Sequence, residues 1–415
     1  MPRSSMDPER RRLLEAALSL GASWLAFRPS ASQAAPSAAP EDPARSTGRT
    51  LAQTGGYGRR SSFATEVRRK STRNGLFGAS FTPLRASQGI LTPSGLHYEV
   101  HRAGVPSIDP ARHRFVLHGW VRSPKVFSLA DLLRFPSVSR FHFLECSDNG
   151  FSEWERPTAK DVQGTHGLTS NSEWTGVPLA TLLREVGLRP GAQWLLAEGG
   201  DGSGLMRSIP LAKALDDALL VYAQNGEALR PEQGFPLRLL LPGFEGNMNI
   251  KWIRRIEVGD RPWMTRSETT SYTDLLSSGK ARIFSFVMEV KSVITRPSGG
   301  MQLPGPGFFE ITGLAWSGRG KIYRVEVSTD GGGHWQRARL QRPVLPKCHT
   351  RFRLPWRWDG RPAVLQSRAI DETGAVQPSL AALVAVRGTH SVNHNNAIQS
   401  WGVAADGSVS NIHHA

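Results

Sequence analysis

The pattern of hydrophobic residues changes near Ser285, and this change constrains the fold more than any other feature. Before it, strand-like and helix-like runs mix without a regular period, as in Arg114–Val121 and Ser128–Leu133. After it, alternating strands meet glycine-rich turns, as in Lys321–Ser328 followed by Thr329–His334. The irregular first part predicts an α+β domain. The evenly spaced strands of the second part predict an immunoglobulin-like β-sandwich.

The remaining elements follow from the same reading of hydrophobic period and turn residues. About 340 residues remain after the N-terminal region, which exceeds one comfortable core and indicates two domains. We expect a helix at Val177–Val186, ended by Gly187, and strands at Phe141–Glu145, Trp194–Ala197, Pro236–Leu241, Ile250–Val258, Trp335–Leu340, Thr350–Leu354 and Val364–Ile370.

The N-terminus has the pattern of an export signal. Glu9–Leu14 contains consecutive arginines, a weakly apolar stretch follows to Phe27, and small residues at Ser32–Ala34 offer a cleavage site. Residues 1–34 therefore predict a twin-arginine signal peptide and export of the folded protein to the periplasm. A charged disordered tail is the alternative. No other segment is long and apolar enough for a membrane span.

Composition divides the rest of the chain. Residues 35–85 begin with a stretch rich in Ala, Pro, Ser, Gly and Arg, and we expect a disordered basic arm there. We place a catalytic domain at residues 86–284, the sandwich at 285–390 and a tail at 391–415. The histidines of the tail fit no standard metal site, so we expect this tail to be solvated.

The chain is strongly basic, with a formal net charge of +16. Such a charge favours acidic partners or anionic substrates. We expect no nucleic-acid binding, because no helix gathers base-reading residues and no basic–aromatic ladder is present.

Cys146 is the first candidate functional residue. It is one of two cysteines, with Cys348, and it follows an apolar strand at the start of the polar turn Ser147–Gly150. A strand that ends in an exposed turn is a rigid support for a reactive side chain, and a thiolate is a soft ligand suited to a redox metal. The alternative is a small buried hydrophobic residue.

Several motifs follow Cys146 in an order that points to a family. The chain resembles the sulfite oxidase family of molybdenum enzymes over residues 96–388. Within that family it resembles the molybdenum subunit of sulfane dehydrogenase, the SoxC type, a match supported by Asn395–Trp401 and Asp406–Val409. The motifs that carry the family resemblance are Glu145–Asn149, Trp174–Leu179, Tyr222–Gly226, Gly234–Arg238, Pro242–Gly243 and Lys251–Trp252.

The resemblance implies one molybdenum–molybdopterin cofactor per chain. Cys146 corresponds to the thiolate that binds the metal beside the two pterin sulfurs, and Tyr272 and Arg102 correspond to catalytic residues. Taken alone, Lys251 and Arg238 would be ordinary surface charges, and Tyr272 a loop residue packed on the second domain. The residues that the resemblance assigns to cofactor binding are Tyr98, His101, Arg102, Asp201, Gln233, Arg238, Asn249, Ile250 and Lys251.

The chain also departs from the family pattern. Arginines of the sulfite pocket fall on Val100, Phe151 and Met248, a histidine falls on Gln233, and a glycine falls on Asp148. Each lost arginine removes charge-assisted binding of a small dianion. A sulfur substrate attached to a carrier protein is easier to reconcile with these changes. The alternative is a divergent pocket with poor activity.

The resemblance therefore predicts an enzyme that oxidises carrier-bound sulfane sulfur in thiosulfate oxidation. The chain contains no Cys-x-x-Cys-His and so no c-type haem of its own, and we expect a c-type cytochrome subunit as electron acceptor. The resemblance also implies a homodimer formed through the sandwich, within a larger hetero-oligomer. The alternatives are a sulfite dehydrogenase acting on free sulfite and a non-catalytic binding subunit, which would carry no stoichiometric molybdenum.

Overall fold

The computed structural model describes residues 55–72, 76–276, 278–389 and 393–414. Contacts along the chain divide it into two units, residues 1–64 and residues 65–415. The predicted signal peptide lies outside the described residues. Within the first unit, residues 55–64 are described, and they contain neither helix nor strand.

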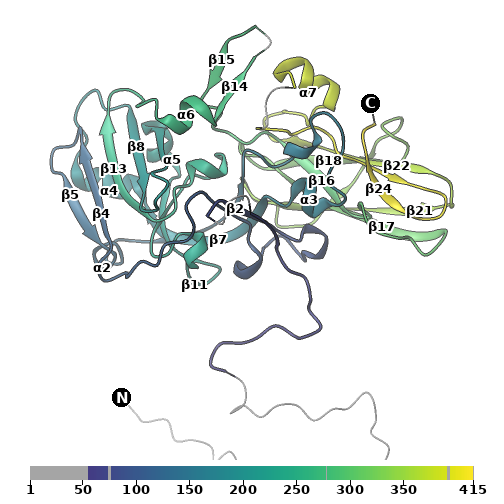
Figure 1. Ribbon diagram of the computed structural model, residues 1–415, viewed down its shortest axis with the longest axis horizontal. Helices are drawn as coiled ribbons and strands as arrows, with labels where there is room; N and C mark the ends of the chain where they lie inside the picture. The colour runs from purple at the N-terminus through teal and green to yellow at the C-terminus, as the bar shows by residue number, and fades with distance from the viewer. Residues whose placement is uncertain (1–54, 73–75, 277, 390–392, 415) are drawn as a thin grey trace, which may run out of the picture. The chain divides into compact units, whose positions relative to one another are not determined.

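The first domain of the larger unit is built on a five-stranded sheet in the order β5-β4-β13-β8-β9 (Figure 1). β4 and β13 pair in parallel, and the other neighbours in this sheet are antiparallel. Apolar residues of α4 recur at helical spacing and are buried in the core of this sheet. The elements are β4 (Arg114–Gly119), β5 (Lys125–Ser128), α2 (Leu129–Leu132), α4 (Leu179–Val186), β8 (Trp194–Gly199), β9 (Met206–Pro210), α5 (Leu211–Asp216) and β13 (Ile253–Gly259).

A second sheet of this domain has the order β11-β10-β7-β6, and β12 also pairs with β10. Its long strand β6 ends at Glu145, so that Cys146 begins the turn at the end of the strand. The strands of this sheet are β6 (Val138–Glu145), β7 (Thr169–Pro178), β10 (Leu219–Gln224), β11 (Glu227–Ala228) and β12 (Arg238–Leu240). Further elements of the domain are η5 (Phe151–Glu153), α3 (Val162–His166), η6 (Pro231–Gln233), η7 (Gly246–Met248), α6 (Arg266–Thr270) and the hairpin β14 (Thr273–Leu275) and β15 (Ala281–Ile283).

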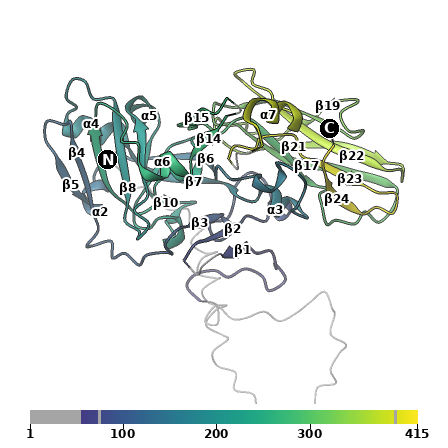
Figure 2. The same ribbon diagram turned by 45° about the horizontal axis from the view of Figure 1, so that its top comes forward.

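The prediction of a disordered arm up to residue 85 is wrong for its last part. Figure 2 shows β1, β2 and β3 side by side in a three-stranded antiparallel sheet. Backbone pairing with β3 satisfies polar groups of this polar segment, a gain that composition does not reveal. The hydroxyls of Thr82 and Ser170 are 2.6 Å apart and buried. The elements are β1 (Arg69–Thr72), β2 (Gly78–Phe81), η3 (Leu84–Ala86), η4 (Ser94–Leu96) and β3 (Glu99–His101).

The second domain is the predicted immunoglobulin-like sandwich. Its two antiparallel sheets have the orders β16-β17-β21-β20 and β19-β18-β22-β23-β24, and they share one hydrophobic core around Trp316 and Phe352. The predicted strand Lys321–Ser328 is present, but the predicted strand Trp335–Leu340 is split into two short strands. β19 pairs with β18, and β20 pairs with β21 in the other sheet. The strands are β16 (Lys291–Arg296), β17 (Gly307–Trp316), β18 (Ile322–Ser328), β19 (Gln336–Arg337), β20 (Arg339–Leu340), β21 (Thr350–Trp358) and β22 (Ala363–Asp371).

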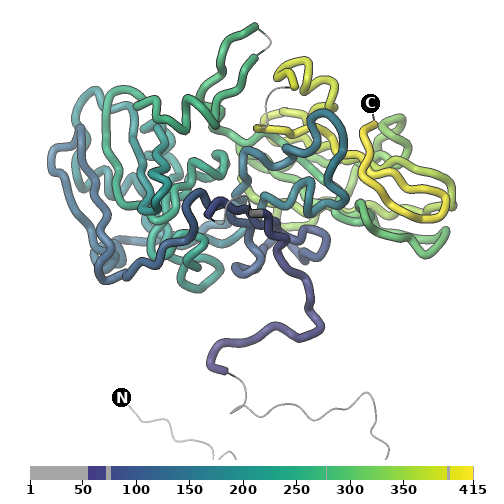
Figure 3. The backbone as a smooth tube through the Cα atoms, viewed as in Figure 1, coloured from purple at the N-terminus to yellow at the C-terminus, as the bar shows by residue number. Residues whose placement is uncertain are grey.

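The prediction of a solvated C-terminal tail is also wrong. After α7 (Leu380–Arg387), the chain returns to the sandwich and adds β23 (Ser400–Val403) and β24 (Val409–Ile412), which Figure 3 traces in yellow. Trp401 is fully buried and its indole N–H donates to the carbonyl oxygen of Ile294 at 3.1 Å. Burial of this ring and backbone pairing with β22 stabilise the segment.

The two domains share part of their packing. Leu84, Phe143 and Val162 belong to the first domain but lie in the hydrophobic cluster of the sandwich. Among the described residues, no helix is long and apolar enough to cross a membrane. The domain boundary at residue 284 stays a prediction, whereas the boundary at 390 does not end the sandwich, because β23 and β24 belong to its second sheet.

Candidate functional site

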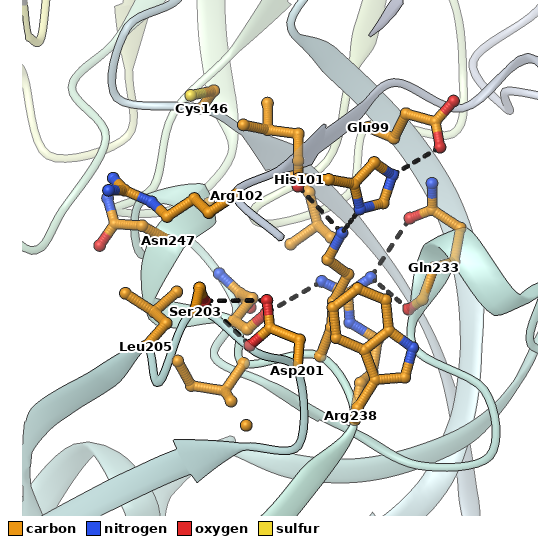
Figure 4. A pocket seen from close by; sticks show the side chains of 18 of the residues that line it. Glu99, His101, Arg102, Cys146, Asp201, Ser203, Leu205, Gln233, Arg238 and Asn247 are labelled. Atoms are coloured by element: carbon orange, nitrogen blue, oxygen red, sulfur yellow. Dashed lines mark hydrogen bonds and ion pairs between the residues drawn. The ribbon is translucent and has the colours of Figure 1, made fainter. Parts of the chain in front are cut away.

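One cavity in the first domain brings together the residues predicted from the sequence (Figure 4). It contains about 760 Å³ of empty space, including open solvent at its mouth. Its wall is formed by β3, the Cys146 turn, the loop after β8, η6 with β12, and η7 with the following loop. The predicted residues that line it are Tyr98, His101, Arg102, Cys146, Asp201, Gln233, Arg238, Asn249, Ile250, Lys251 and Tyr272.

The Cys146 turn is held by a buried network from the second domain. Glu145 ends β6 and is fully buried, and its carboxylate accepts hydrogen bonds from Lys291 at 2.6 Å and from Trp316 at 2.7 Å. Asn149 closes the turn, since its side chain donates to Glu145 at 2.8 Å and its backbone N–H donates to the carbonyl of Cys146 at 3.0 Å. The thiol is therefore carried by a strand end and a turn that are both anchored.

Gly246 permits a close approach beside the thiol. A Cβ atom at this position would lie 2.7 Å from the Tyr98 hydroxyl, 2.9 Å from the Glu145 carbonyl and 3.2 Å from the Cα of Cys146. The first two distances are shorter than real Cβ atoms show, so a larger residue would displace the Cys146 turn. Sequence reasoning missed Gly246, although its place soon after Pro242–Gly243 was a usable signal.

Arg238 provides a buried guanidinium at the base of the cavity. It donates to the carbonyl oxygen of Gln233 at 2.9 Å and to that of Asn249 at 3.1 Å. Its Nε has no hydrogen-bond partner within the described part of the chain. Burial lowers the pKa of Arg238 to about 10, a value at which the group stays charged at neutral pH. A buried donor without a partner costs free energy unless a ligand satisfies it.

Lys251 lies in the same cavity and faces three acceptors. Its ammonium donates to the carbonyl oxygens of Val100 at 3.0 Å and Glu232 at 3.2 Å, and it lies 2.9 Å from Nδ1 of His101. Burial, followed by the charge of Arg238, lowers the pKa of Lys251 to about 7. An anion bound between these two cations would restore the charged form of Lys251.

His101 is oriented by Glu99. Its Nε2 lies 2.7 Å from the Glu99 carboxylate, which also accepts from Arg68 at 2.8 Å and from Ser80 at 3.1 Å. Burial would raise the pKa of Glu99, but the hydrogen bond from His101 and the charge of Arg68 lower it to about 2. The ionised carboxylate thereby fixes the imidazole that faces Lys251.

Tyr272 lies between two arginines. Arg102 donates to its hydroxyl at 2.6 Å, and the guanidinium carbon of Arg207 lies 4.4 Å from the ring centroid. Burial raises the pKa of Tyr272 well above its ordinary value, ahead of the opposing charge of Arg102. The phenol therefore stays protonated and can hydrogen-bond to a substrate. Arg207 is fully buried, and sequence reasoning missed it because no motif marks it.

The other predicted residues have narrower roles. The Ser203 hydroxyl donates to the Asp201 carboxylate in the loop after β8 and lies 2.9 and 2.8 Å from its two oxygens. Asn249 is occupied within its own loop, because its side chain accepts from the N–H of Leu241 at 2.7 Å and donates to the carbonyl of Glu245 at 3.0 Å. Cavity-lining residues that sequence reasoning missed include His97, Ser203, Leu205, Gly246 and Asn247.

The structure corrects the predicted set of altered pocket positions. Val100 lines the cavity, but Phe151 and Met248 do not. Met248 is fully buried in the core of the five-stranded sheet, and Phe151 is 46% exposed beside the Cys146 turn. The reason is that a match in linear sequence fixes neither the direction of a side chain nor the course of a loop. Arg102, two residues after Val100, does point into the cavity.

Three comparisons place the chain among known proteins. Residues 102–267 match the family model described as the oxidoreductase molybdopterin-binding domain, and residues 282–400 match the Mo-co oxidoreductase dimerisation domain. The crystal structure of the sulfane dehydrogenase SoxCD from Paracoccus pantotrophus contains a chain 44% identical in sequence. The alignment covers 90% of the present chain and 97% of that chain, with a TM-score of 0.87. The present chain belongs to the sulfite oxidase family of molybdenum oxidoreductases.

Curated relatives agree with this membership of the sulfite oxidase family. The mitochondrial sulfite oxidase of Rattus norvegicus is 30% identical over 74% of the chain, and nitrate reductase 1 of Arabidopsis thaliana is 32% identical over 66%. The chain spans 60% of the length of the first and 33% of the length of the second. Membership of the sulfite oxidase family implies a molybdenum–molybdopterin cofactor.

The chemistry of the cavity fits such a cofactor. The described residues contain no cluster of three or more His, Cys, Asp or Glu side chains able to hold a metal, and Cys146 would contribute one thiolate. A pterin dithiolene supplies two further sulfurs. Burial and the charge of Asp148 raise the pKa of the Cys146 thiol well above its ordinary value, and coordination would remove the proton. Arg238, with its unpartnered Nε, and Lys251 fit the pterin phosphate.

Proposed function

We propose that this molybdenum oxidoreductase oxidises sulfane sulfur carried by another protein. The observation that carries this proposal is the match to sulfane dehydrogenase SoxCD, at 44% identity over 90% of the chain. The cavity wall adds support, because Val100 places an apolar side chain where the sulfite-oxidising relatives are expected to have an arginine. Fewer cations at that wall favour a substrate that is not a small free dianion.

Each side chain of the site has a proposed role. Cys146 holds the metal, and Arg238 and Lys251 bind the pterin phosphate while Gln233, Asn249 and Ile250 shape the loop around it. Tyr98, His101 and Asp201 complete the cofactor-binding wall. The cofactor, when bound, supplies two-electron oxygen transfer to sulfur. Tyr272 donates a hydrogen bond to the substrate, and Arg102 holds the phenol and provides positive charge for the sulfur-bound oxygens.

The proposal includes partners and location. We propose a c-type cytochrome subunit as electron acceptor, a sulfur-carrier protein as substrate and a homodimer formed through the sandwich domain. The match of residues 282–400 to a dimerisation domain supports the homodimer. Residues 1–34 support export to the periplasm as a folded protein, since a twin-arginine signal is read by a folded-protein exporter.

The test uses purified full-length protein loaded with molybdenum, a c-type cytochrome and two substrates offered separately. We expect cytochrome reduction with a carrier protein that bears a persulfide or thiosulfonate on cysteine, and at least tenfold less with free sulfite. Cys146→Ser should abolish turnover and lower the molybdenum content. Cys348→Ser is the matched control, since Cys348 is the other free cysteine and lies in contact with the Phe141 carbonyl away from the cavity.

A sulfite dehydrogenase is the second candidate. The sulfite oxidases that are 30% identical over 74% of the chain favour it. Efficient turnover of free sulfite without a carrier would replace the first proposal by this one. Absence of molybdenum in the protein, from cells that load a control molybdoenzyme, would exclude both and leave a non-catalytic binding subunit.

A further inference from the structure

The C-terminal segment reaches from the second domain to the Cys146 turn. The backbone N–H of His394 donates to the carbonyl oxygen of Ser147 at 2.8 Å. The side chain of Asn395 donates to the carbonyl oxygen of Gly150 at 3.2 Å. Gly150 and Asn395 are also in close contact, because a Cβ on Gly150 would lie 3.2 Å from Asn395. The segment therefore supports both ends of the turn that carries the thiol.

His394 is enclosed between two carboxylates. Its Nε2 lies 3.2 Å from Glu245 and its Nδ1 lies 3.0 Å from Glu289. Since each ring nitrogen faces an acceptor, both nitrogens carry protons and the ring is an imidazolium. Burial would lower the pKa of His394, but the hydrogen bonds and charges of the two carboxylates raise it to about 10.

One side of this bridge leads to the ring of Tyr272. Glu245 accepts from Nη2 of Arg207 at 3.1 Å, and the Arg207 guanidinium lies against the Tyr272 ring, with its carbon 4.4 Å from the centroid. Arg207 also donates to the side chain of Asn247, which lines the cavity. Glu245 therefore fixes a cation that packs on the phenol.

The other side leads to the backbone around the same tyrosine. Glu289 accepts from Arg387 at 2.9 Å, and Arg387 donates to Asp274 at 2.8 Å, two residues after Tyr272. Asn393 donates to the carbonyl of Ser271, the residue before Tyr272, at 3.2 Å. Cations and carboxylates alternate along this path, and His394 is the link between its two halves.

We propose that His394 is a positioning residue for the active site. By joining Glu245 to Glu289, it fixes the position of Tyr272 relative to the Cys146 turn. The contribution of Tyr272 to turnover rests on the function proposed above. The role of His394 in positioning Tyr272 is independent of that function. The other charged groups that face this network are Arg207, Glu268, Arg387 and Asp274. Without His394, Glu245 and Glu289 lose their common cation. Arg207, which packs on the Tyr272 ring, and the backbone around Tyr272 then become free to move.

The test combines a spectroscopic reporter with kinetics on the molybdenum-loaded enzyme. The chain has five tyrosines, so incorporation of 3-fluorotyrosine gives five ¹⁹F signals, and Tyr272→Phe assigns the relevant one. We expect His394→Ala to shift or broaden the Tyr272 signal and to leave the signals of Tyr57, Tyr222 and Tyr323 unchanged. Glu289→Gln should do the same to a smaller extent. His394→Lys should restore part of the signal, because one ammonium can donate to both carboxylates.

Kinetics should show a loss in turnover rather than in binding. Misplacement of an active-site group by about 1 Å costs up to about 10²-fold, so we expect kcat and kcat/KM to fall together by about 10-fold to 100-fold in His394→Ala, with KM changed little. His334→Ala is the matched control, because the side chain of His334 is 91% exposed in the sandwich hairpin.

The outcomes separate this proposal from the proposed function. A Tyr272 signal that stays unmoved in both His394→Ala and Glu289→Gln overturns the positioning role, whatever the activity. If His394→Ala does not fold, Glu289→Gln decides by the same criterion. A wild-type enzyme inactive on every sulfur substrate overturns the proposed function, while the ¹⁹F comparison still decides the role of His394.

Discussion

Replacement of Lys291 by Met should destabilise the joint between the two domains severely. Glu145 and Lys291 are 0% and 1% exposed as side chains, and their charged atoms lie 2.6 Å apart. At an effective dielectric constant of about 20, charges at this distance attract by roughly 6 kcal/mol, most of which offsets the loss of hydration. Met leaves the carboxylate with hydrogen bonds from Trp316 and Asn149 but without a countercharge.

The expected cost is that of an uncompensated buried charge, about 3–5 kcal/mol. For a domain of 150–250 residues, this corresponds to a fall in Tm of roughly 6–20 °C. The molybdenum content should also fall, because Glu145 directly precedes Cys146 in the sequence. Thermal unfolding followed by circular dichroism, together with elemental analysis, measures both effects.

A second variant distinguishes charge burial from simple loss of packing. Glu145→Gln combined with Lys291→Met removes both charges, so it should be clearly more stable than Lys291→Met alone. Lys321→Met, at an exposed lysine of the sandwich, should stay within about 0.5 kcal/mol of wild type. A double variant as unstable as the sum of the two single variants would refute the reasoning, as would a Lys291→Met protein that loses less than about 1 kcal/mol.

Four further predictions concern the cavity. Arg238→Met should weaken cofactor retention by about 10-fold to 150-fold, the value of one charge-assisted hydrogen bond. Molybdenum per chain after gel filtration measures this loss. Arg254→Met, at an exposed arginine, is the control. The pKa of Lys251 is lowered to about 7 in the folded protein, so the unfolded chain binds more protons above pH 7. The free energy of unfolding of the cofactor-free protein should therefore rise with pH from about 7 to about 10.4. Urea titrations measure this slope, and Lys251→Met should remove it. Binding of the anionic cofactor should take up a proton at pH 8, which calorimetry in buffers of different ionisation enthalpy detects. Gly246→Ala places a methyl group 2.7 Å from the Tyr98 hydroxyl and should lower the molybdenum content at least fivefold without unfolding the protein; full retention of the metal would show that the Cys146 turn tolerates displacement.

The sequence predicted local features well where one short motif carries all the information. The helix-like run Ser128–Leu133 is an example, because Ser128 and Asp131 form a capping box at the start of α2 within four consecutive residues. The strand before Cys146 and the helix that ends at Gly187 are further examples. The cavity residues were found through a resemblance, and the structure brings them to one cavity from elements of three different sheets.

The sequence was misleading where stability depends on a distant partner. The segment around β1 and β2 is polar, and it is ordered by pairing with β3. The histidine-containing C-terminus lacks a local pattern, and it is ordered by the burial of Trp401 and the ion pairs of His394. Met248 matched a pocket position in linear register, but its side chain lies in the core.

The sequence by itself determined the two-domain order, the α+β and sandwich classes, and the position of Cys146 at a strand end, because hydrophobic period and turn residues act over a few neighbours. Only the tertiary structure decided which charges surround the thiol. Lys291, Trp316 and His394 come from the second domain, more than 140 residues after Cys146 in the chain. Their contacts with Glu145 and Glu245 exist because the two domains exclude water from a common joint, where pairing of buried charges becomes obligatory.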